Sequence, residues 1–174
     1  MLIFKVIGCI LVIVSSTGVG FYFSNEMKSR VEDLKELKKL IGLLRGDIRY
    51  GSTPLPEAIS AIAKRNSGHF EEFFIRVASR LGELSGVTFS EVWKEAVGKD
   101  LINTSLSRKD KLQLIEFGGN LGYLDKDMQM NNLDQYLNQL EDEIKELTKT
   151  LKEKTYLYSS LGIMAGIFIS IIML

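Results

Sequence analysis

Apolar residues are concentrated at the two ends of this chain. The stretch 2–23 carries one charged residue, Lys5, and the stretch 156–174 carries none. Each has the roughly 20 residues that a helix rising about 1.5 Å per residue needs to cross about 30 Å of hydrocarbon. We therefore predict transmembrane helices over 2–23 and 156–174, with a soluble domain over 24–155 between them.

Basic residues next to the inner ends of the two predicted spans indicate the orientation of the chain. Because loops rich in Lys and Arg stay on the cytoplasmic side, the domain is expected in the cytoplasm and both termini on the far side. The same residues form a candidate surface for anionic lipid headgroups, at up to about 1 kcal/mol each, although setting the topology alone would also explain them. This basic flank consists of Lys28, Arg30, Lys145, Lys149, Lys152 and Lys154.

Within the domain, apolar residues recur at steps of three and four, which is typical of helices. One such seam lies over 27–50 and another over 133–151. Two seams of similar length are expected to pack on each other as antiparallel helices of one chain; a dimeric coiled coil is the alternative. The seams are Met27, Val31, Leu34, Leu37, Ile41, Leu44 and Ile48, and Leu133, Leu137, Leu140, Ile144, Leu147 and Leu151.

Turn and capping residues divide the stretch between the seams into four shorter helices. Gly51 suits the C′ position after the first helix, and either Pro54 or Pro56 suits the first turn of the next. Thr88 and Ser107 each precede an acidic residue by three positions, which predicts two capping boxes. We expect an all-α, six-helix antiparallel bundle whose first and last helices continue into the transmembrane helices.

Three glycines lie inside the predicted fifth helix, at Gly118, Gly119 and Gly122. Each costs about 1 kcal/mol relative to alanine in a helix, so close approach of a neighbouring helix is the simplest reason for them. Trp93, on the predicted fourth helix, is either a core residue or an anchor for a partner.

The sequence offers little material for catalysis. His69 is the single histidine, and the single cysteine, Cys9, lies within the first apolar stretch, so a cluster of His and Cys metal ligands is excluded. His69 is interpreted as a bystander in a turn. Asp125 either forms an acid pair with Asp127 or, by preference, caps the sixth helix. We predict no enzyme activity, no cofactor and no metal site.

Charge and small residues add two further expectations. All 22 acidic residues and all but one of the 22 basic residues lie between the apolar ends, which leaves a domain charge near −1 and argues against nucleic acid. In the second apolar stretch, Gly162 and Gly166 form a G-x-x-x-G motif that would pack helices closely, either within one chain or between two.

Two strings of residues resemble a known family. They are Y-G-S-T-P-L-P-E-A-I at 50–59 and F-G-G-N-L-G-Y-L-D-K-D-M-Q at 117–129. With the two apolar ends, they resemble the stage III sporulation protein AB family of endospore-forming bacteria over nearly the whole chain. The second string is also similar to the cytoplasmic domains of type II secretion F platform proteins, which are six-helix antiparallel bundles.

The resemblance implies a role and partners. Its family belongs to an apparatus that links mother cell and forespore, which would place this chain in the outer forespore membrane with its domain in the mother-cell cytoplasm. The secretion F relatives act above a cytoplasmic ATPase, so the implied partners are the apparatus ATPase, stage III sporulation protein AA, and other membrane components. Those relatives carry two such domains, and a chain with one could match them by forming a homo-oligomer.

We therefore expect a non-catalytic platform with a partner-docking groove at the loops. Two alternatives are a membrane-tethered enzyme or signalling domain with an unrecognised carboxylate site, and a small channel subunit. The same loop residues could also serve only to shape turns and helix contacts. The candidate docking residues are Gly51, Pro54, Leu55, Gly118, Leu121, Gly122, Asp125 and Gln129.

Overall fold

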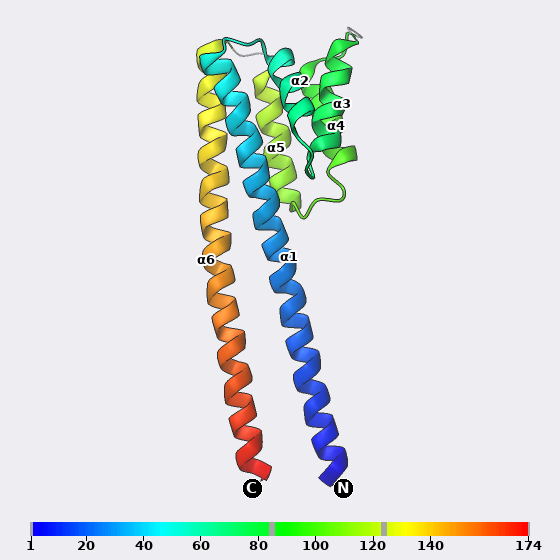
Figure 1. Cartoon of the computed structure of the whole chain (residues 1–174), viewed down its shortest axis with the longest axis vertical. Coiled ribbons are helices and arrows are strands. Elements are labelled where there is room, and N and C mark those ends of the chain that lie inside the picture. Colours follow the sequence, from blue (N-terminus) through cyan, green and yellow to red (C-terminus); the bar gives the residue numbers. More distant parts are fainter. Residues whose placement is uncertain (1, 84–85, 123–124, 174) are drawn as a thin grey trace. The chain divides into compact units, whose positions relative to one another are not determined.

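The computed structural model describes the backbone of residues 2–83, 86–122 and 125–173, and the side chains of 25–83, 86–122 and 125–153. Over these residues the chain is all-helical, with six helices and no strand (Figure 1). It divides into two units, one over 30–144 and one formed by the two chain ends. The helices are α1 (Leu2–Tyr50), α2 (Leu55–Arg65), α3 (Glu71–Gly82), α4 (Phe89–Asp100), α5 (Arg108–Leu121) and α6 (Lys126–Met173).

The predicted membrane spans remain predictions. No helix long and apolar enough to cross a membrane is present among the residues that the structure describes. The stretches 2–23 and 156–174 lie outside the residues with described side chains, as do Lys154, Gly162 and Gly166.

Within the 30–144 unit, α1 and α6 run antiparallel. Lys38 Nζ lies 3.1 Å from Glu141 Oε2, and Arg45 Nε lies 2.5 Å from Asp134 Oδ1. A step of seven residues forward along α1 therefore corresponds to seven residues back along α6. This register confirms the predicted pairing of the two seams within one chain.

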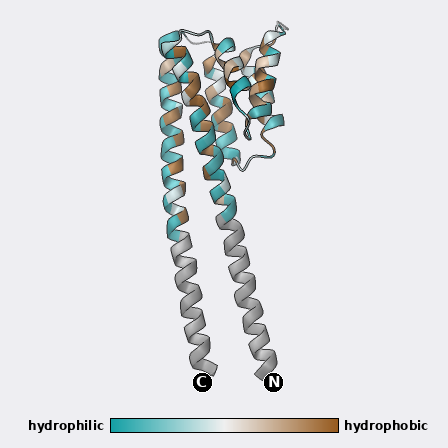
Figure 2. Cartoon of the chain, in the orientation of Figure 1, coloured by the Kyte–Doolittle hydropathy of each residue, from teal (hydrophilic) through white to brown (hydrophobic). Residues whose placement is uncertain are grey.

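The first seam supplies a large part of the core. Val31, Leu34, Leu37, Ile41, Leu44 and Ile48 are all buried, as predicted, and Leu40 joins them. On α6 the buried positions are Leu133, Tyr136 and Leu140, so Tyr136 replaces the predicted Leu137. Figure 2 shows the described part of α6 as largely hydrophilic on the side in view, which agrees with its narrow apolar stripe.

The short helices α2 to α5 pack around aromatic side chains. Phe70, Phe73, Phe74 and Trp93 are fully buried, and the Phe73 and Trp93 rings meet edge to face with centroids 4.8 Å apart. Edge-to-face pairs at this separation are worth about 0.5–1.5 kcal/mol beyond the area that they bury. Trp93 is therefore a core residue, and the idea of a partner anchor at Trp93 is wrong.

Most predicted helix boundaries are confirmed. Thr88 and Ser107 each form a complete capping box, with Glu91 and Asp110 respectively, and Pro54 is the N-cap residue of α2. On α5, Leu114 is buried and Leu112 is exposed.

Gly51 has a different role from the one predicted. The left-handed backbone after α1 is at Ser52, with φ of 47°, not at Gly51. A Cβ on Gly51 would instead lie 2.6 Å from the Asp47 carbonyl oxygen and 2.7 Å from Thr53 Oγ1. Glycine is needed there for space.

Candidate functional site

The two predicted docking stretches lie together. Lys126 Nζ, at the start of α6, donates a hydrogen bond of 3.0 Å to Ser52 Oγ, in the turn after α1. Tyr50 and Met128 flank this contact, and their side chains are 84% and 56% exposed. We call Tyr50, Ser52, Lys126 and Met128 the turn surface; its two apolar side chains were not identified from the sequence, because neither belongs to a seam.

The glycines of α5 allow close helix packing. A Cβ on Gly118 would overlap the Trp93 indole ring, and one on Gly122 would lie 2.8 Å from Phe89 Cβ. Trp93 Nε1 donates a hydrogen bond of 2.8 Å to the Leu114 carbonyl, so the indole is fixed against α5. The predicted close approach is confirmed for Gly118 and Gly122.

Two of the candidate docking residues are inside the protein. Gly118 and Leu121 are buried, and no partner can contact their side-chain positions without opening α4 from α5. Leu121 is fully buried, so a substitution there would test folding rather than docking.

The polar residues of the second string connect α5 to α6. Asp125 Oδ1 accepts a hydrogen bond of 2.9 Å from the Met128 N–H, which confirms that Asp125 caps α6. Gln129 Nε2 donates to the Leu121 carbonyl at 3.0 Å, and Asn132 Nδ2 donates to the Phe117 carbonyl at 3.2 Å. The Leu121 carbonyl lies at the end of α5, where a helix leaves acceptors without intrahelical donors. Gln129 therefore has a structural partner.

The remaining docking candidates lie near the turn surface. Gly51, Pro54, Gly122 and Asp125 are exposed, and Leu55 is half-buried. With Tyr50 and Met128, they are the residues of this region that solvent can reach.

One residue of the basic flank, Arg30, already has hydrogen-bond partners within the protein. The Arg30 guanidinium makes two hydrogen bonds to the Asp110 carboxylate, at 2.7 and 2.8 Å, and a third to Glu143 at 2.8 Å. Because Arg30 is engaged by two carboxylates, it is not a free lipid contact. Lys28 and Lys152 are exposed, Lys149 lies 4.0 Å from Glu153, and Lys145 also has an interaction partner.

Asp110 is the buried end of this network. Its carboxylate accepts hydrogen bonds from the Ser107 N–H and hydroxyl, both at 2.8 Å, as well as those from Arg30. Burial alone would raise the pKa of Asp110, but the Arg30 and Ser107 hydrogen bonds outweigh it and hold the pKa below its usual value.

A second buried carboxylate, Asp33, was not identified from the sequence. Asp33 Oδ1 lies 2.6 Å from His69 Nδ1, and Asp33 Oδ2 accepts the Ser105 N–H at 2.6 Å. The hydrogen bond to Asp33 and its negative charge raise the pKa of His69. The interpretation of His69 as a bystander is therefore wrong: it ties the loop before α3 to α1. Asp33 lies between apolar positions of the first seam and leaves their spacing of three and four residues intact, so the hydrophobic pattern did not indicate a buried carboxylate there.

A third buried carboxylate also has a hydrogen-bond partner. Asp100, whose side chain is 3% exposed, receives two hydrogen bonds from Arg76, at 2.5 and 2.7 Å. Asp33, Asp100 and Asp110 are thus each hydrogen-bonded to the side chain of a basic residue, which is typical of structural rather than catalytic acids.

Comparison with known proteins identifies similar chains. A family model described as Stage III sporulation protein AB matches residues 5–174. Stage III sporulation protein AB of Bacillus subtilis (strain 168) is 24% identical over 170 residues, which cover 98% of this chain and 99% of that protein. A solved structure of Stage III sporulation protein AB (SpoIIIAB) has 24% identity and a TM-score of 0.64, covers 71% of this chain and 97% of its own, and shows the same fold.

Proposed function

This chain belongs to the stage III sporulation protein AB family, and on that premise we propose that it is a non-catalytic platform subunit of a sporulation apparatus. In this role its cytoplasmic bundle docks the ATPase of the apparatus, stage III sporulation protein AA, and its two terminal helices hold it in the outer forespore membrane beside other stage III membrane proteins. The observation that carries the docking role is the turn surface, where two stretches far apart in the sequence meet and leave Tyr50 and Met128 exposed.

Several features support a docking surface there. Tyrosine, methionine and arginine are enriched in protein interfaces, and exposed apolar side chains rimmed by polar groups are typical of them. Ser52, Asp125 and Lys126 are exposed polar residues within three positions of Tyr50 or Met128 in the sequence, and the Arg49 guanidinium carbon lies 5.7 Å from the Tyr50 ring centroid.

The platform reading is favoured over an enzyme. The buried carboxylates Asp33, Asp100 and Asp110 already have basic side chains as hydrogen-bond partners, and the similar proteins are named as sporulation proteins rather than enzymes. An acid or base for catalysis needs access to a substrate proton, which these buried, paired groups lack.

Membrane placement is supported by the two apolar stretches and tested separately from docking. Reporter domains fused to the two termini, one active only in the cytoplasm and one only outside it, are expected to place both termini outside. Cytoplasmic activity at either terminus would contradict two spans flanking a cytoplasmic bundle.

The docking role is tested by alanine variants of the turn surface. Tyr50→Ala combined with Met128→Ala is expected to weaken binding of the full-length chain, in detergent, to the purified ATPase by at least about 30-fold, the effect of losing about 2 kcal/mol at an interface hot spot. The same variant should lower sporulation while leaving the protein's abundance and thermal unfolding unchanged.

A matched control uses exposed apolar residues on other faces. Ile75 and Ile102 are 47% and 69% exposed, so Ile75→Ala with Ile102→Ala removes a comparable area of apolar surface. The control should bind the ATPase normally. Equal binding by both double variants would contradict a docking role for the turn surface.

A further inference from the structure

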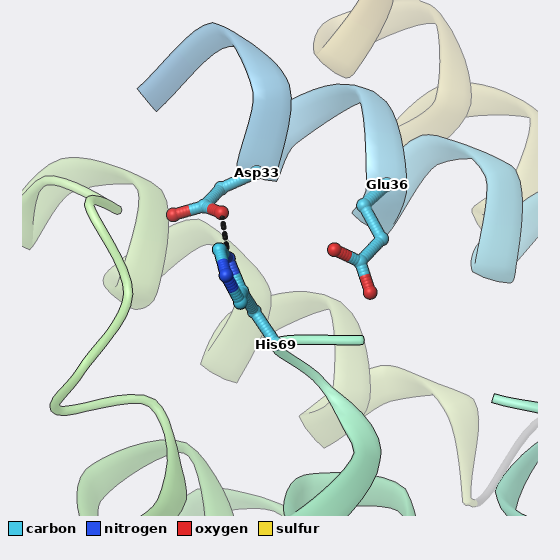
Figure 3. A group of neighbouring side chains, drawn as sticks. All are labelled: Asp33, Glu36 and His69. Atoms are coloured by element: carbon cyan, nitrogen blue, oxygen red, sulfur yellow. Dashed lines mark hydrogen bonds and ion pairs between the residues drawn. The ribbon is translucent and has the colours of Figure 1, made fainter. Parts of the chain in front are cut away.

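Three potential metal ligands from two segments converge within the 30–144 unit. Asp33 and Glu36 lie three residues apart on α1 and therefore on one side of it, and His69 comes from the loop before α3. Ligand atoms of the three side chains lie within 4.8 Å of one another. Figure 3 shows Asp33 and Glu36 extending from α1 towards His69.

Hydrogen bonding explains two of these residues and not the third. Asp33 is held by His69 and by the Ser105 N–H, and His69 is held by Asp33. Glu36 Oε1 is shielded from solvent and has no hydrogen-bond partner among the described residues. A buried carboxylate oxygen without a donor, near a second carboxylate, is costly in free energy unless a cation compensates it.

The surrounding backbone leaves space for the Glu36 carboxylate. A Cβ on Gly68 would overlap Glu36 Oε1, so the carboxylate occupies the volume that any other residue at 68 would fill. Gly68 is next to His69, and its N–H donates to Asn66 Oδ1 at 3.3 Å, which orders this loop. The glycine therefore allows the third ligand to approach the other two.

We propose that Asp33, Glu36 and His69 bind one divalent transition-metal ion, with Zn²⁺ the best match. Imidazole nitrogen and carboxylate oxygen are usual zinc ligands, at about 2.0–2.2 Å from the ion, and a fourth position can be filled by water. Two ligand atoms on one tetrahedral ion lie about 3.4 Å apart. Metal binding would therefore replace the 2.6 Å hydrogen bond between His69 Nδ1 and Asp33 Oδ1 and would draw together three ligand atoms that already lie within 4.8 Å of one another.

The parts of the site have different roles in this proposal. The Ser105 N–H orients Asp33 from behind, as hydrogen bonds to metal-ligating carboxylates commonly do. His69, whose side chain is 68% exposed, gives an ion access from solvent. Zinc binding would hold the loop before α3 against α1, so the ion would stabilise the bundle rather than take part in a reaction.

The test uses the full-length chain in detergent, stripped of metal and titrated with Zn²⁺. We expect one zinc per chain by metal analysis, and a higher unfolding temperature with zinc, because a ligand that binds the folded state stabilises it. Glu36→Gln and His69→Gln should each weaken zinc binding by at least tenfold. Glu57→Gln, at an exposed carboxylate on α2, is the control and should bind zinc like the natural chain.

A measurement on the metal-free protein separates a ligand from a purely structural residue. If Glu36 is a ligand without a partner in the apo state, metal-free Glu36→Gln should unfold at the same or a higher temperature than the natural chain. Absence of stoichiometric zinc, or unchanged affinity in Glu36→Gln, would overturn the proposal.

Discussion

The contact between Gly118 and Trp93 determines how closely α4 and α5 approach. The indole lies where a side chain at 118 would begin, and its N–H is satisfied by the Leu114 carbonyl. The ring also meets Phe117 with centroids 5.9 Å apart. Because Gly118 has no Cβ, the largest side chain of the core fits between α4 and α5.

This contact predicts opposite outcomes at neighbouring glycines. Gly118→Ala should lower the free energy of unfolding by about 1–3 kcal/mol, because the added methyl group must displace a buried ring. Gly119→Ala should be neutral or stabilising by up to about 1 kcal/mol, since a Cβ there is 3.5 Å from Ser90 Oγ, an ordinary contact, and alanine favours the helix.

Urea unfolding followed by circular dichroism measures both variants. Equal stabilities for Gly118→Ala and Gly119→Ala would show that the Trp93 ring can move aside at little cost.

At the scale of elements, one ion-pair network links three helices. Arg30 on α1 contacts Asp110 on α5 and Glu143 on α6, and Lys109 on α5 reaches Glu143 at 2.8 Å. Asp110 is also the acidic member of the capping box that starts α5. The same carboxylate therefore begins one helix and ties it to another.

Replacing Asp110 tests this double role. Asp110→Asn should lower the free energy of unfolding by about 2 kcal/mol near neutral pH. The substitution removes the charge-assisted hydrogen bonds between Arg30 and the buried carboxylate at position 110. The pKa of Asp110 is lowered on folding, so its ionised form contributes stability that is present above the unfolded carboxyl pKa of about 3.9 and is lost as the pH falls below it.

The difference in unfolding free energy between the natural chain and Asp110→Asn should thus shrink from pH 6 towards pH 2. Asp142→Asn, an exposed position on α6, is the control and should change stability little at either pH. A constant difference for Asp110→Asn would indicate that charge at Asp110 is unimportant.

Local patterns predicted the elements well, and long-range polar contacts less well. Steps of three and four and the residues Thr88 and Ser107 located the helices and their starts, because both depend on neighbours within a few residues. The long-range partners of Asp33 and Asp110 could not be predicted, because they come from residues 36 to 80 positions away in the sequence. Polar pairs whose members lie this far apart in the sequence produce no periodic pattern of residues.

The positions of the candidate docking residues, rather than docking itself, were predicted in part, for a related reason. The two strings around the turns did prove to be neighbours, through Lys126 and Ser52. Their glycines and amides serve mainly the α4–α5–α6 packing, and the exposed apolar side chains, Tyr50 and Met128, depend on where the helices end in space.

At the scale of the whole molecule, the buried apolar residues among the described side chains belong to one unit. Every buried apolar side chain in the described range lies between Val31 and Leu140, inside the unit 30–144. The stability of the bundle should therefore not depend on the chain ends.

A fragment of residues 25–153 is expected to fold on its own without detergent. It should be strongly helical by circular dichroism and unfold in one cooperative transition, because it retains the seams of α1 and α6 together with α2 to α5. Aggregation or a non-cooperative transition would show that the chain ends are needed for the fold.

Trp93 is the single tryptophan of the chain, and it lies at the centre of this packing. Its intrinsic fluorescence therefore reports one place, the α4–α5 contact, without any label. Emission should be shifted to the blue in the folded protein and move to the red when the indole meets water. The same signal can follow the bundle in membranes, with the ATPase or with zinc, and shows whether any of them loosens its core.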